Sequence, residues 1–280
     1  MWKNRLMIGI VLFLLLVNLP LRSEAGTFMF GVKGWYTSWE SSMLDWFDKN
    51  ITADFASKGI SISTDTDNGS GYLAGPLVSY QSDNGKWSAS FAAMVFSSFS
   101  QDWNAKAAGM DMENDVDLKR RDIDIAVSYS LNKYVSVFWG YKYQDMEIDF
   151  KLSYDTLMGS ITNKYKIESK VHIPTIGTGF VYPVSDKLAL STQLGLLYSI
   201  PTLEMTDNDD EKHDIWTDGT VGFNGEFTLN YQPTGNLIFQ LGYRYQYFRL
   251  DADALDDQYS GKTESDDITH GPIISAVWVF

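Results

Sequence analysis

Apolar and polar residues alternate with a period of two along most of this chain. The clearest example is the segment 236–250, where the odd positions from 237 to 247 are apolar or aromatic and the even positions include Gln240, Arg244 and Gln246. A period of two is the repeat of a β-strand, because successive side chains point to opposite faces of a sheet. The pattern predicts ten strands, at residues 27–39, 70–81, 86–99, 120–131, 134–148, 167–182, 187–200, 217–231, 236–250 and 268–280.

The connections between these segments fall into two classes. Four are short and rich in turn residues, with Asn84 followed by Gly85 as the strongest hairpin signal. They lie at residues 82–85, 132–133, 184–186 and 232–235. Five are long and polar, at residues 40–69, 100–119, 149–166, 201–216 and 251–267. Short and long connections alternate strictly, so every long loop would lie at one end of a barrel, as is typical of transmembrane barrels.

We therefore expect an all-β fold, a transmembrane antiparallel up-and-down β-barrel of about ten strands. Eight or twelve strands are the alternatives if residues 40–69 contain a further hairpin or if the strand at 167–182 is wrongly placed. In that strand Pro174 and the run from Gly177 to Gly179 interrupt the alternation, which predicts a β-bulge. A soluble β-sandwich is the rival fold, but it offers no reason for all long loops to share one end.

Aromatic residues gather near both ends of the predicted strands. Those near the short turns are Tyr80, Trp87, Tyr129, Tyr134, Tyr182 and Tyr231, and those near the long loops are Tyr36, Trp39, Tyr143, Tyr198, Tyr245 and Tyr247. Amphipathic rings are favoured where a membrane meets water, so the pattern predicts two aromatic girdles. The alternative is that tyrosine merely favours strands.

The first 25 residues have the composition of a secretory signal peptide. Lys3 and Arg5 precede an unbroken apolar run from Met7 to Val17, and small residues flank a cleavage position after Ala25. We expect residues 1–25 to be removed and residues 26–280 to form the barrel. A membrane anchor is disfavoured, because the apolar run is too short for a helix to cross roughly 30 Å of hydrocarbon.

The chain ends in an alternating segment with an aromatic last residue. Ile274, Ala276, Trp278 and Phe280 share one face, and we expect Trp278 and Phe280 to face lipid. Together with the signal and the strand pattern, this terminus resembles the C-terminal signature of Gram-negative outer-membrane β-barrel proteins, including small porin-like barrels. The resemblance implies export through the periplasm, insertion by the barrel-assembly machinery, and a place in the bacterial outer membrane among lipid and lipopolysaccharide. We expect a monomer.

Composition excludes several classes of protein. The chain has no cysteine, so it has neither a disulfide framework nor a thiolate metal site. Its formal net charge of −14 argues against a nucleic-acid-binding protein, because binding phosphates needs a surplus of Lys and Arg. An acidic surface attracts cations instead.

Six charged residues fall on lumen-facing positions of the predicted strands. They are Lys33, Asp122, Asp124, Lys142, Glu226 and Arg244. A barrel of ten strands leaves at most a narrow passage, so these residues form either a salt-bridged plug or the selectivity filter of a narrow pore. Asp122 and Asp124 place two carboxylates on one face of one strand, where Arg120, Arg121 or the lumen cations could neutralise them.

The long connections are acidic. One contains Asp207, Asp209, Asp210 and Glu211, and the segment 251–257 carries further aspartates. Carboxylates are suitable ligands for calcium, but the spacing departs from that of an EF-hand loop. We therefore expect no bound metal and no cofactor. Solvated acidic loops that associate loosely with divalent cations, or bridge through them to lipopolysaccharide, fit the composition better.

The three histidines of the chain are His172, His213 and His270. His213 is close in sequence to Asp209, Asp210 and Asp214, and His270 follows two aspartates, so a histidine–carboxylate couple could form at the rim of the barrel. No motif of the omptin-type proteases or of the lipid A-modifying barrels is present. The sequence therefore predicts no enzyme, with a rim-active hydrolase as the alternative.

The function that this pattern favours is a narrow channel for small solutes or cations, with acidic loops at its outer mouth. The alternative is a non-conducting barrel that binds partners at the cell surface, as an adhesin does, or associates there with cations and lipopolysaccharide.

Overall fold

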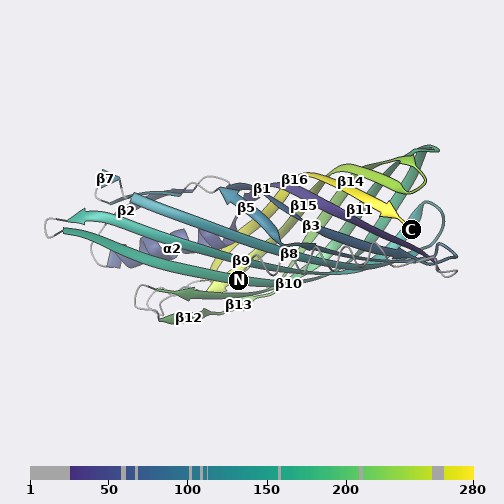
Figure 1. Ribbon diagram of the computed structural model, residues 1–280. Helices are drawn as coiled ribbons and strands as arrows, with labels where there is room; N and C mark the ends of the chain where they lie inside the picture. The colour runs from purple at the N-terminus through teal and green to yellow at the C-terminus, as the bar shows by residue number, and fades with distance from the viewer. Residues whose placement is uncertain are drawn as a thin grey trace.

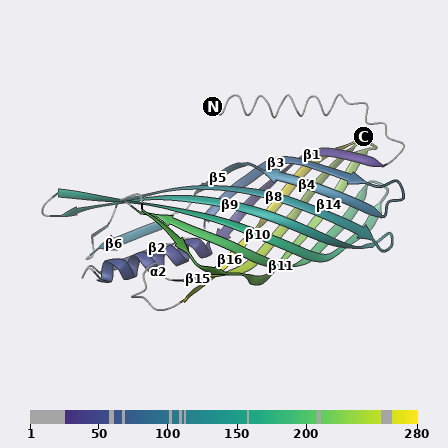
Figure 2. The ribbon, with the colours of Figure 1, turned by 90° about the horizontal axis from the view of Figure 1, so that it is seen from below.

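A computed structural model describes residues 26–57, 61–66, 69–100, 103–107, 110–111, 113–156, 159–207, 211–253 and 262–280. Ten strands wind around a closed antiparallel barrel, which confirms the predicted fold and strand count (Figures 1 and 2). In ring order they are β1 (Thr27–Glu40), β3 (Gly69–Gln81), β4 (Trp87–Met94) with its continuation β5 (Phe96–Ser100), β8 (Glu113–Ser130), β9 (Val135–Thr156), β10 (Gly159–Ser185), β11 (Leu188–Thr206), β14 (Thr220–Thr234), β15 (Leu237–Asp253) and β16 (Lys262–Val279). The barrel closes because β1 pairs with β3 on one side and with β16 on the other. The predicted signal, residues 1–25, lies outside the described residues.

Five shorter strands and one helix lie outside this ring within the described part of the chain. A small sheet consists of β2 (Ile62–Thr66), β6 (Trp103–Ala107) and β7 (Met110–Asp111). The strand β12 (Lys212–Ile215) pairs with β11, and β13 (Thr217–Asp218) pairs with β15. The helix α2 (Ser42–Ser57) follows β1 directly. Among the described residues, no helix is both long enough and apolar enough to cross a bilayer.

The long connections were predicted as polar loops, and this prediction is wrong for most of their length. β9 and β10 continue through the segment 149–166 and stay paired up to Thr156 and Gly159. β8, β11, β15 and β16 also extend beyond their predicted ends. Figures 1 and 2 show β9 and β10 projecting well past the ring, at the end where α2 lies.

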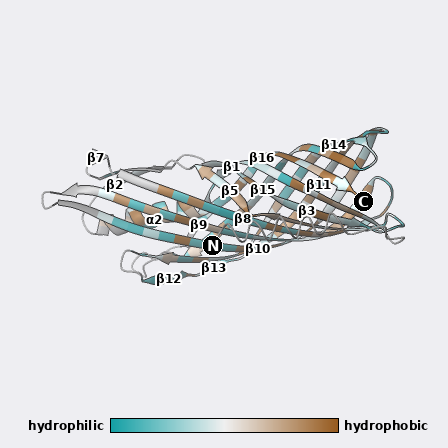
Figure 3. Cartoon of the chain, viewed as in Figure 1, coloured by the Kyte–Doolittle hydropathy of each residue, from teal (hydrophilic) through white to brown (hydrophobic). Residues whose placement is uncertain are grey.

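The extensions escaped the sequence analysis because their polarity is inverted. Near the short turns, the outward positions of β9 are apolar and aromatic, such as Trp139 and Tyr141. Farther along, the outward positions are Asp145, Glu147, Asp149 and Lys151, while the buried inward positions are Met146, Ile148, Phe150 and Leu152. The alternation persists, and only the side that holds the charges has changed. Figure 3 shows hydrophilic and hydrophobic positions alternating along these strands.

The exterior of the barrel carries an apolar belt between the short turns and these extensions. The exposed side chains of the belt include Val32, Ile125, Trp139, Ile176, Leu196, Val221, Phe239, Leu241 and Ile274. On β15 and β16 the belt ends at Tyr247 and Ile268, because the next outward residues are Arg249 and Asp266, which form an ion pair at 3.3 Å. Beyond this level the exterior is charged.

The predicted bulge at Pro174 to Gly179 does not form. Pro174 stays in register with Tyr141, and the irregularity in the pairing of β10 with β11 lies between Pro183 and Ser185. Gly177 instead provides space for a neighbouring side chain. A Cβ atom at Gly177 would lie 2.6 Å from the ring of Phe138, so the glycine makes room for an aromatic side chain inside the lumen.

The helix α2 begins at a capped turn. The hydroxyl of Ser41 accepts a hydrogen bond from the backbone N–H of Leu44, the usual arrangement at a helix N-terminus. The apolar face of α2 packs inside the extensions of the strands, in a core that also contains Trp39. Trp39 was predicted in the outer aromatic girdle. It is 1% exposed and lies in this core, because the inverted polarity begins near the end of β1.

Candidate functional site in the barrel lumen

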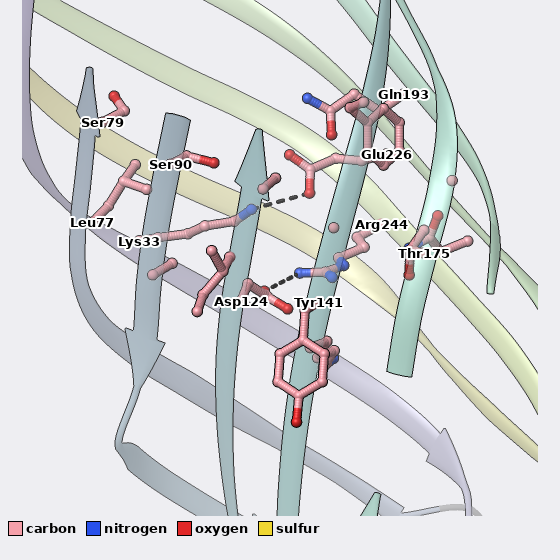
Figure 4. Close-up of a pocket in the computed structure, with 18 of the residues that line it drawn as sticks. Lys33, Leu77, Ser79, Ser90, Asp124, Tyr141, Thr175, Gln193, Glu226 and Arg244 are labelled. Atoms are coloured by element: carbon pink, nitrogen blue, oxygen red, sulfur yellow. Dashed lines mark hydrogen bonds and ion pairs between the residues drawn. The ribbon is translucent and has the colours of Figure 1, made fainter. Parts of the chain in front are cut away.

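The six charged residues predicted to face the lumen meet there as three ion pairs. Lys33 of β1 binds Glu226 of β14 at 3.0 Å, and Arg244 of β15 binds Asp124 of β8 at 2.9 Å (Figure 4). Lys142 of β9 binds Asp122 at 2.7 Å. The strands β8 and β15 lie on opposite sides of the ring and β1 and β14 are not neighbours, so the first two pairs cross the lumen, whereas Lys142 and Asp122 lie on the neighbouring strands β9 and β8.

Arg120 was predicted as one possible partner of the two aspartates but was not placed among the lumen-facing residues, and it does face the lumen. Its side chain is fully buried, binds both carboxylate oxygens of Asp122, and donates to Gln144 and Thr269. The signal was present in the sequence, because Arg120 shares the even-numbered phase of Asp122 and Asp124. It stood at the first position of the predicted strand, where phase is least reliable. Its neighbour Arg121 points outward, toward Asp145.

Trp35 lies at the centre of this cationic group. The guanidinium carbons of Arg120 and Arg244 lie 5.7 and 5.0 Å from the ring centroid, and the Lys142 nitrogen lies at 5.2 Å. These distances are within the range of cation–π attraction. Trp35 is 1% exposed and packs with Leu73, Met94 and Ile273. The middle of the lumen is therefore filled by side chains.

On the side of the short turns, the lumen contains a cavity of about 260 Å³. Two ion pairs face it, Lys33 with Glu226 and Arg244 with Asp124 (Figure 4). The amides of Gln193, Asn224 and Gln240 also line it. Gln193 is exposed although it points inward. By contrast, Asp122 and Gln144 on the other side of the cavity are 0% exposed. The cavity is thus open toward the short turns and blind toward α2.

One wall of the lumen near the short turns is lined by uncharged polar groups. The hydroxyl of Ser275 donates to Gln240, whose amide donates to Asn230 at 2.7 Å. The Asn230 amide in turn donates to Ser191 at 2.9 Å. This chain crosses four neighbouring strands, from β16 to β11, and keeps the inner wall hydrophilic without adding charge.

The outer half of the lumen is closed by α2 and an apolar core. Phe47 of α2 stacks on Phe150 of β9, with ring centroids 4.1 Å apart. The indole N–H of Trp46 donates to the carbonyl of Asp253 at 2.8 Å, which ties the helix to β15. The buried residues of this core are Trp39, Met43, Leu44, Trp46, Phe47, Ile51, Phe55, Leu118, Met146, Ile148, Phe150, Leu152, Ile167, Leu203, Met205, Ile215, Leu250 and Ala252.

Asp267 lies beneath the first turn of α2, just beyond the apolar belt. One of its oxygens accepts hydrogen bonds from the Trp39 indole and the Ser42 hydroxyl, both at 3.2 Å. The other oxygen is buried and has no hydrogen-bond partner among the described residues. Burial raises the pKa of Asp267 to about 6, although nearby Arg120 acts in the opposite direction.

The acidic segment of residues 207–211 is described only at its two ends. Asp209 and Asp210 lie outside the described residues. Asp207, Glu211 and His213 each place one ligand atom within 4.8 Å of the others, and the His213 ring nitrogen is 3.4 Å from Asp207. These three side chains could hold a metal ion, but they are solvent-accessible, and no further described residue joins the group.

The other two histidines face outward and contact tyrosines. The hydroxyl of Tyr141 lies 2.5 Å from Nδ1 of His172, and that of Tyr243 lies 2.6 Å from Nδ1 of His270. In the described part of the chain, neither histidine has a carboxylate partner. The couple considered between His270 and its neighbouring aspartates does not form, because Asp267 points inward and Asp266 is bound by Tyr247 and Arg249.

Charged residues cover the outside of the strand extensions. Lys119 binds Glu147 at 3.2 Å, and Lys166 binds Glu147 at 3.4 Å. The hydrogen bond to Glu147 raises the pKa of Lys119. Burial tends to raise the pKa of Glu147, but the two lysines hold it below its ordinary value. The outer half of the barrel thus has a charged exterior and an apolar interior, the arrangement of a water-soluble protein.

The C-terminal residues lie at the edge of the belt. Trp278 and Phe280 are 45% and 46% exposed, and the Phe280 ring packs edge-on against Phe30 with centroids 5.8 Å apart. The backbone N–H of Phe280 donates to the carbonyl of Phe28, so β1 holds the end of the chain.

No protein-family model matches the sequence, and no curated protein matches it. Solved structures do match. The translocator domain of the autotransporter NalP from Neisseria meningitidis is 9% identical, with 98% of this chain and 95% of that chain covered and a TM-score of 0.48. The outer membrane protease OmpT from Escherichia coli is 11% identical, with 94% and 98% covered and a TM-score of 0.42. The Ralstonia pickettii toluene transporter TbuX is 9% identical, with 92% and 90% covered and a TM-score of 0.38. These similarities concern the fold alone.

Proposed function

We propose that this chain, which has the fold of an outer-membrane β-barrel, is closed to ions and acts at the cell surface through the half that projects beyond the membrane. The observation that carries the proposal is the apolar core around α2, where Trp46 and Phe47 are no more than 1% exposed. A conducting channel needs a continuous polar path, and a close-packed apolar layer interrupts it. Of the functions predicted from the sequence, the packing favours the non-conducting barrel over the narrow channel.

The apolar belt supports a place in the outer membrane. Outside the barrel, side chains such as Leu241 and Ile274 are 59% and 63% exposed, which is costly in water and favourable in hydrocarbon. A closed ring also pairs the backbone groups of every strand, as lipid requires. We place the hydrocarbon between the short turns and the level of Tyr247 and Ile268. The extensions then lie on the outer side.

The charged exterior of the extensions supports a role in surface binding. It offers Lys119, Glu147 and Lys166 on the paired strands β8, β9 and β10, at the height where lipid headgroups and external partners are met. Lipopolysaccharide, with or without bridging divalent cations, is the partner that this position favours. Insertion by the barrel-assembly machinery and a monomeric state remain predictions.

Planar-bilayer recording of the purified, folded protein tests the proposal. We expect electrical silence at neutral pH. In the control, a flexible linker of glycine and serine replaces residues 42–57, and we expect stepwise conductance because the apolar layer has lost its central element. Steady single-channel conductance of the unaltered protein would contradict the proposal.

Restricted passage of small solutes remains the second candidate. The cavity favours it, because the side chains of Asp124 and Glu226 retain 23% exposure and the wall is hydrophilic. If the barrel conducts, we expect a preference for cations that declines when the charges of Asp122 and Asp124 are removed by substitution with asparagine.

An enzymatic role has less support. Of the three histidines, His213 is the one that binds a carboxylate within the described residues, that of Asp207. Turnover of peptide or lipid A substrates that is lost in His213→Ala would establish a rim-active hydrolase. We expect no turnover.

A further inference from the structure

The cavity on the short-turn side of the lumen contains more hydrogen-bonding capacity than the protein uses. Lys33 makes one hydrogen bond, to one oxygen of Glu226, so its remaining N–H groups and the second oxygen of Glu226 have no partner among the described residues. Arg244 and Asp124 likewise share a single hydrogen bond, from one nitrogen to one oxygen. A guanidinium has five N–H donors and a carboxylate about four acceptor positions, so most of this capacity is free.

Two amides add to this unused capacity. The side chains of Gln193 and Asn224 line the cavity, and neither has a hydrogen-bond partner among the described residues. Gln193 lies directly opposite Glu226 in the pairing of β11 with β14. Figure 4 shows the side chains of Gln193 and Glu226 next to each other, on the wall that faces Lys33. Donors and acceptors from several strands therefore face one shared space.

The charges around this space are balanced. Three cations and two carboxylates line the cavity, and the third cation, Lys142 at the blind end, is neutralised by Asp122, which lies outside the lining. A solute with a single charge would be attracted by one member of each pair and repelled by the other. A solute that carries both charges can place its carboxylate beside Lys33 or Arg244 and its ammonium group beside Glu226 or Asp124.

Size restricts the occupant further. The volume of about 260 Å³ is below the roughly 300–1,000 Å³ of pockets that hold drug-sized molecules. The apolar lining is limited to side chains such as Leu77, Ala92 and Phe138. A small, hydrophilic molecule fits this volume and lining, and a lipid or an aromatic hydrocarbon does not.

We propose that the cavity is a binding site for a small zwitterionic solute, of the size of a free amino acid, which enters from the end of the barrel with the short turns. The charged groups of the site are Lys33, Glu226, Arg244 and Asp124, and the amides of Gln193 and Asn224 orient the solute. The site lies on the near side of the closed layer, so its occupation does not depend on whether the barrel conducts.

Ligand-detected saturation-transfer NMR and calorimetry on the folded protein in detergent test the site. The probes are L-alanine and γ-aminobutyrate, which carry both charges, with acetate and ethylamine as single-charge controls. We expect saturable binding of at least one zwitterion, at least tenfold tighter than either control. No saturable binding of either zwitterion, or equal binding of acetate or ethylamine, would overturn the proposal.

Variants locate the binding. Glu226→Gln keeps the shape of the side chain and removes one charge, and we expect it to weaken zwitterion binding at least tenfold. The double variant Lys33→Met/Glu226→Met removes the whole pair without leaving an unpaired charge, and we expect the same loss from a barrel that still folds. Phe227→Leu, at the neighbouring lipid-facing position, should bind as the unaltered protein does. Unchanged binding in the double variant, or an equal loss in Phe227→Leu, would overturn the assignment.

Discussion

At the scale of single residues, the orientation of a side chain decides what it contributes. Arg120 and Arg121 are neighbours in sequence, but Arg120 is fully buried on the lumen side and Arg121 is 54% exposed on the outside. Buried ion pairs differ from exposed ones, because removing one member leaves a desolvated charge behind. The two arginines therefore form a natural pair of test and control.

We predict that Arg120→Met destabilises the barrel by about 3–5 kcal/mol, because buried Asp122 loses one of its two cationic partners and the Gln144 oxygen loses its donor. Arg121→Met should change the unfolding free energy by no more than about 0.5 kcal/mol. Urea titrations in lipid vesicles, followed by tryptophan fluorescence, measure the unfolding free energy of each variant. Equal effects of the two substitutions would contradict the assigned faces of β8.

Asp267 predicts a dependence of stability on pH. Its pKa is about 6 in the folded protein, against an ordinary value of 3.8, so the folded state binds the proton more tightly. The contribution of Asp267 to stability is therefore greatest below about pH 4 and is lost as pH rises from 4 to 6. The loss is on the order of 3 kcal/mol.

Other carboxylates titrate over the same range, so the measurement is a difference. The unfolding free energy of the unaltered protein minus that of Asp267→Asn should fall between pH 4 and pH 7, because asparagine does not titrate. If this difference stays constant or rises between pH 4 and pH 7, burial does not raise the pKa of Asp267 in the folded protein.

At the scale of elements, the outer half behaves as a separate packing unit. Its strands and α2 enclose an apolar core, and its exterior is charged, whereas the belt has an apolar exterior. The elements that were expected to be loops are therefore held by side-chain packing and by the strand pairing of β9 with β10. Regions of this kind resist local unfolding.

We predict that Phe47→Ala loosens the outer half and leaves the belt intact. The ring stacks on Phe150 and is 1% exposed, and truncation of such a side chain costs about 3–5 kcal/mol. Hydrogen exchange should accelerate in residues 145–170, while exchange in residues 187–200 stays slow. Uniform acceleration over both segments would mean that the two halves unfold together.

At the scale of the whole molecule, two surfaces of opposite polarity divide the barrel along its axis. The apolar belt requires lipid, and the charged extensions require water, so the boundary between them fixes the depth of insertion. The two outward positions Leu241 and Thr202 lie on opposite sides of this boundary.

We predict that Leu241→Arg lowers the stability of the barrel in lipid vesicles by about 2–4 kcal/mol, because a guanidinium then faces hydrocarbon. Thr202→Arg places the same group beyond Ile200, and its effect should be no more than about 0.5 kcal/mol. The order of the two unfolding midpoints checks the prediction. A larger loss of stability in Thr202→Arg than in Leu241→Arg would contradict the proposed position of the membrane along the barrel.

Much of the fold follows from local pattern. The alternation of apolar and polar side chains, with short turns such as Asn84 and Gly85, determined ten strands, their antiparallel order and the lumenal face that carries Lys33, Asp124, Glu226 and Arg244. A period of two is a property of the strand itself, so it can be recognised without knowing what surrounds the strand.

Only the tertiary structure decided whether the apolar face of each strand segment points out of the barrel or into it. The same alternation serves an apolar exterior at Leu241 and an apolar interior at Ile148, and the sequence does not state where one changes into the other. The pairing of distant residues was also beyond the sequence, because Lys33 and Glu226 meet across the lumen only after the ring has closed. For the same reason, α2 was not foreseen, since its core with Phe150 and Leu203 exists only where strands far apart in the chain enclose it.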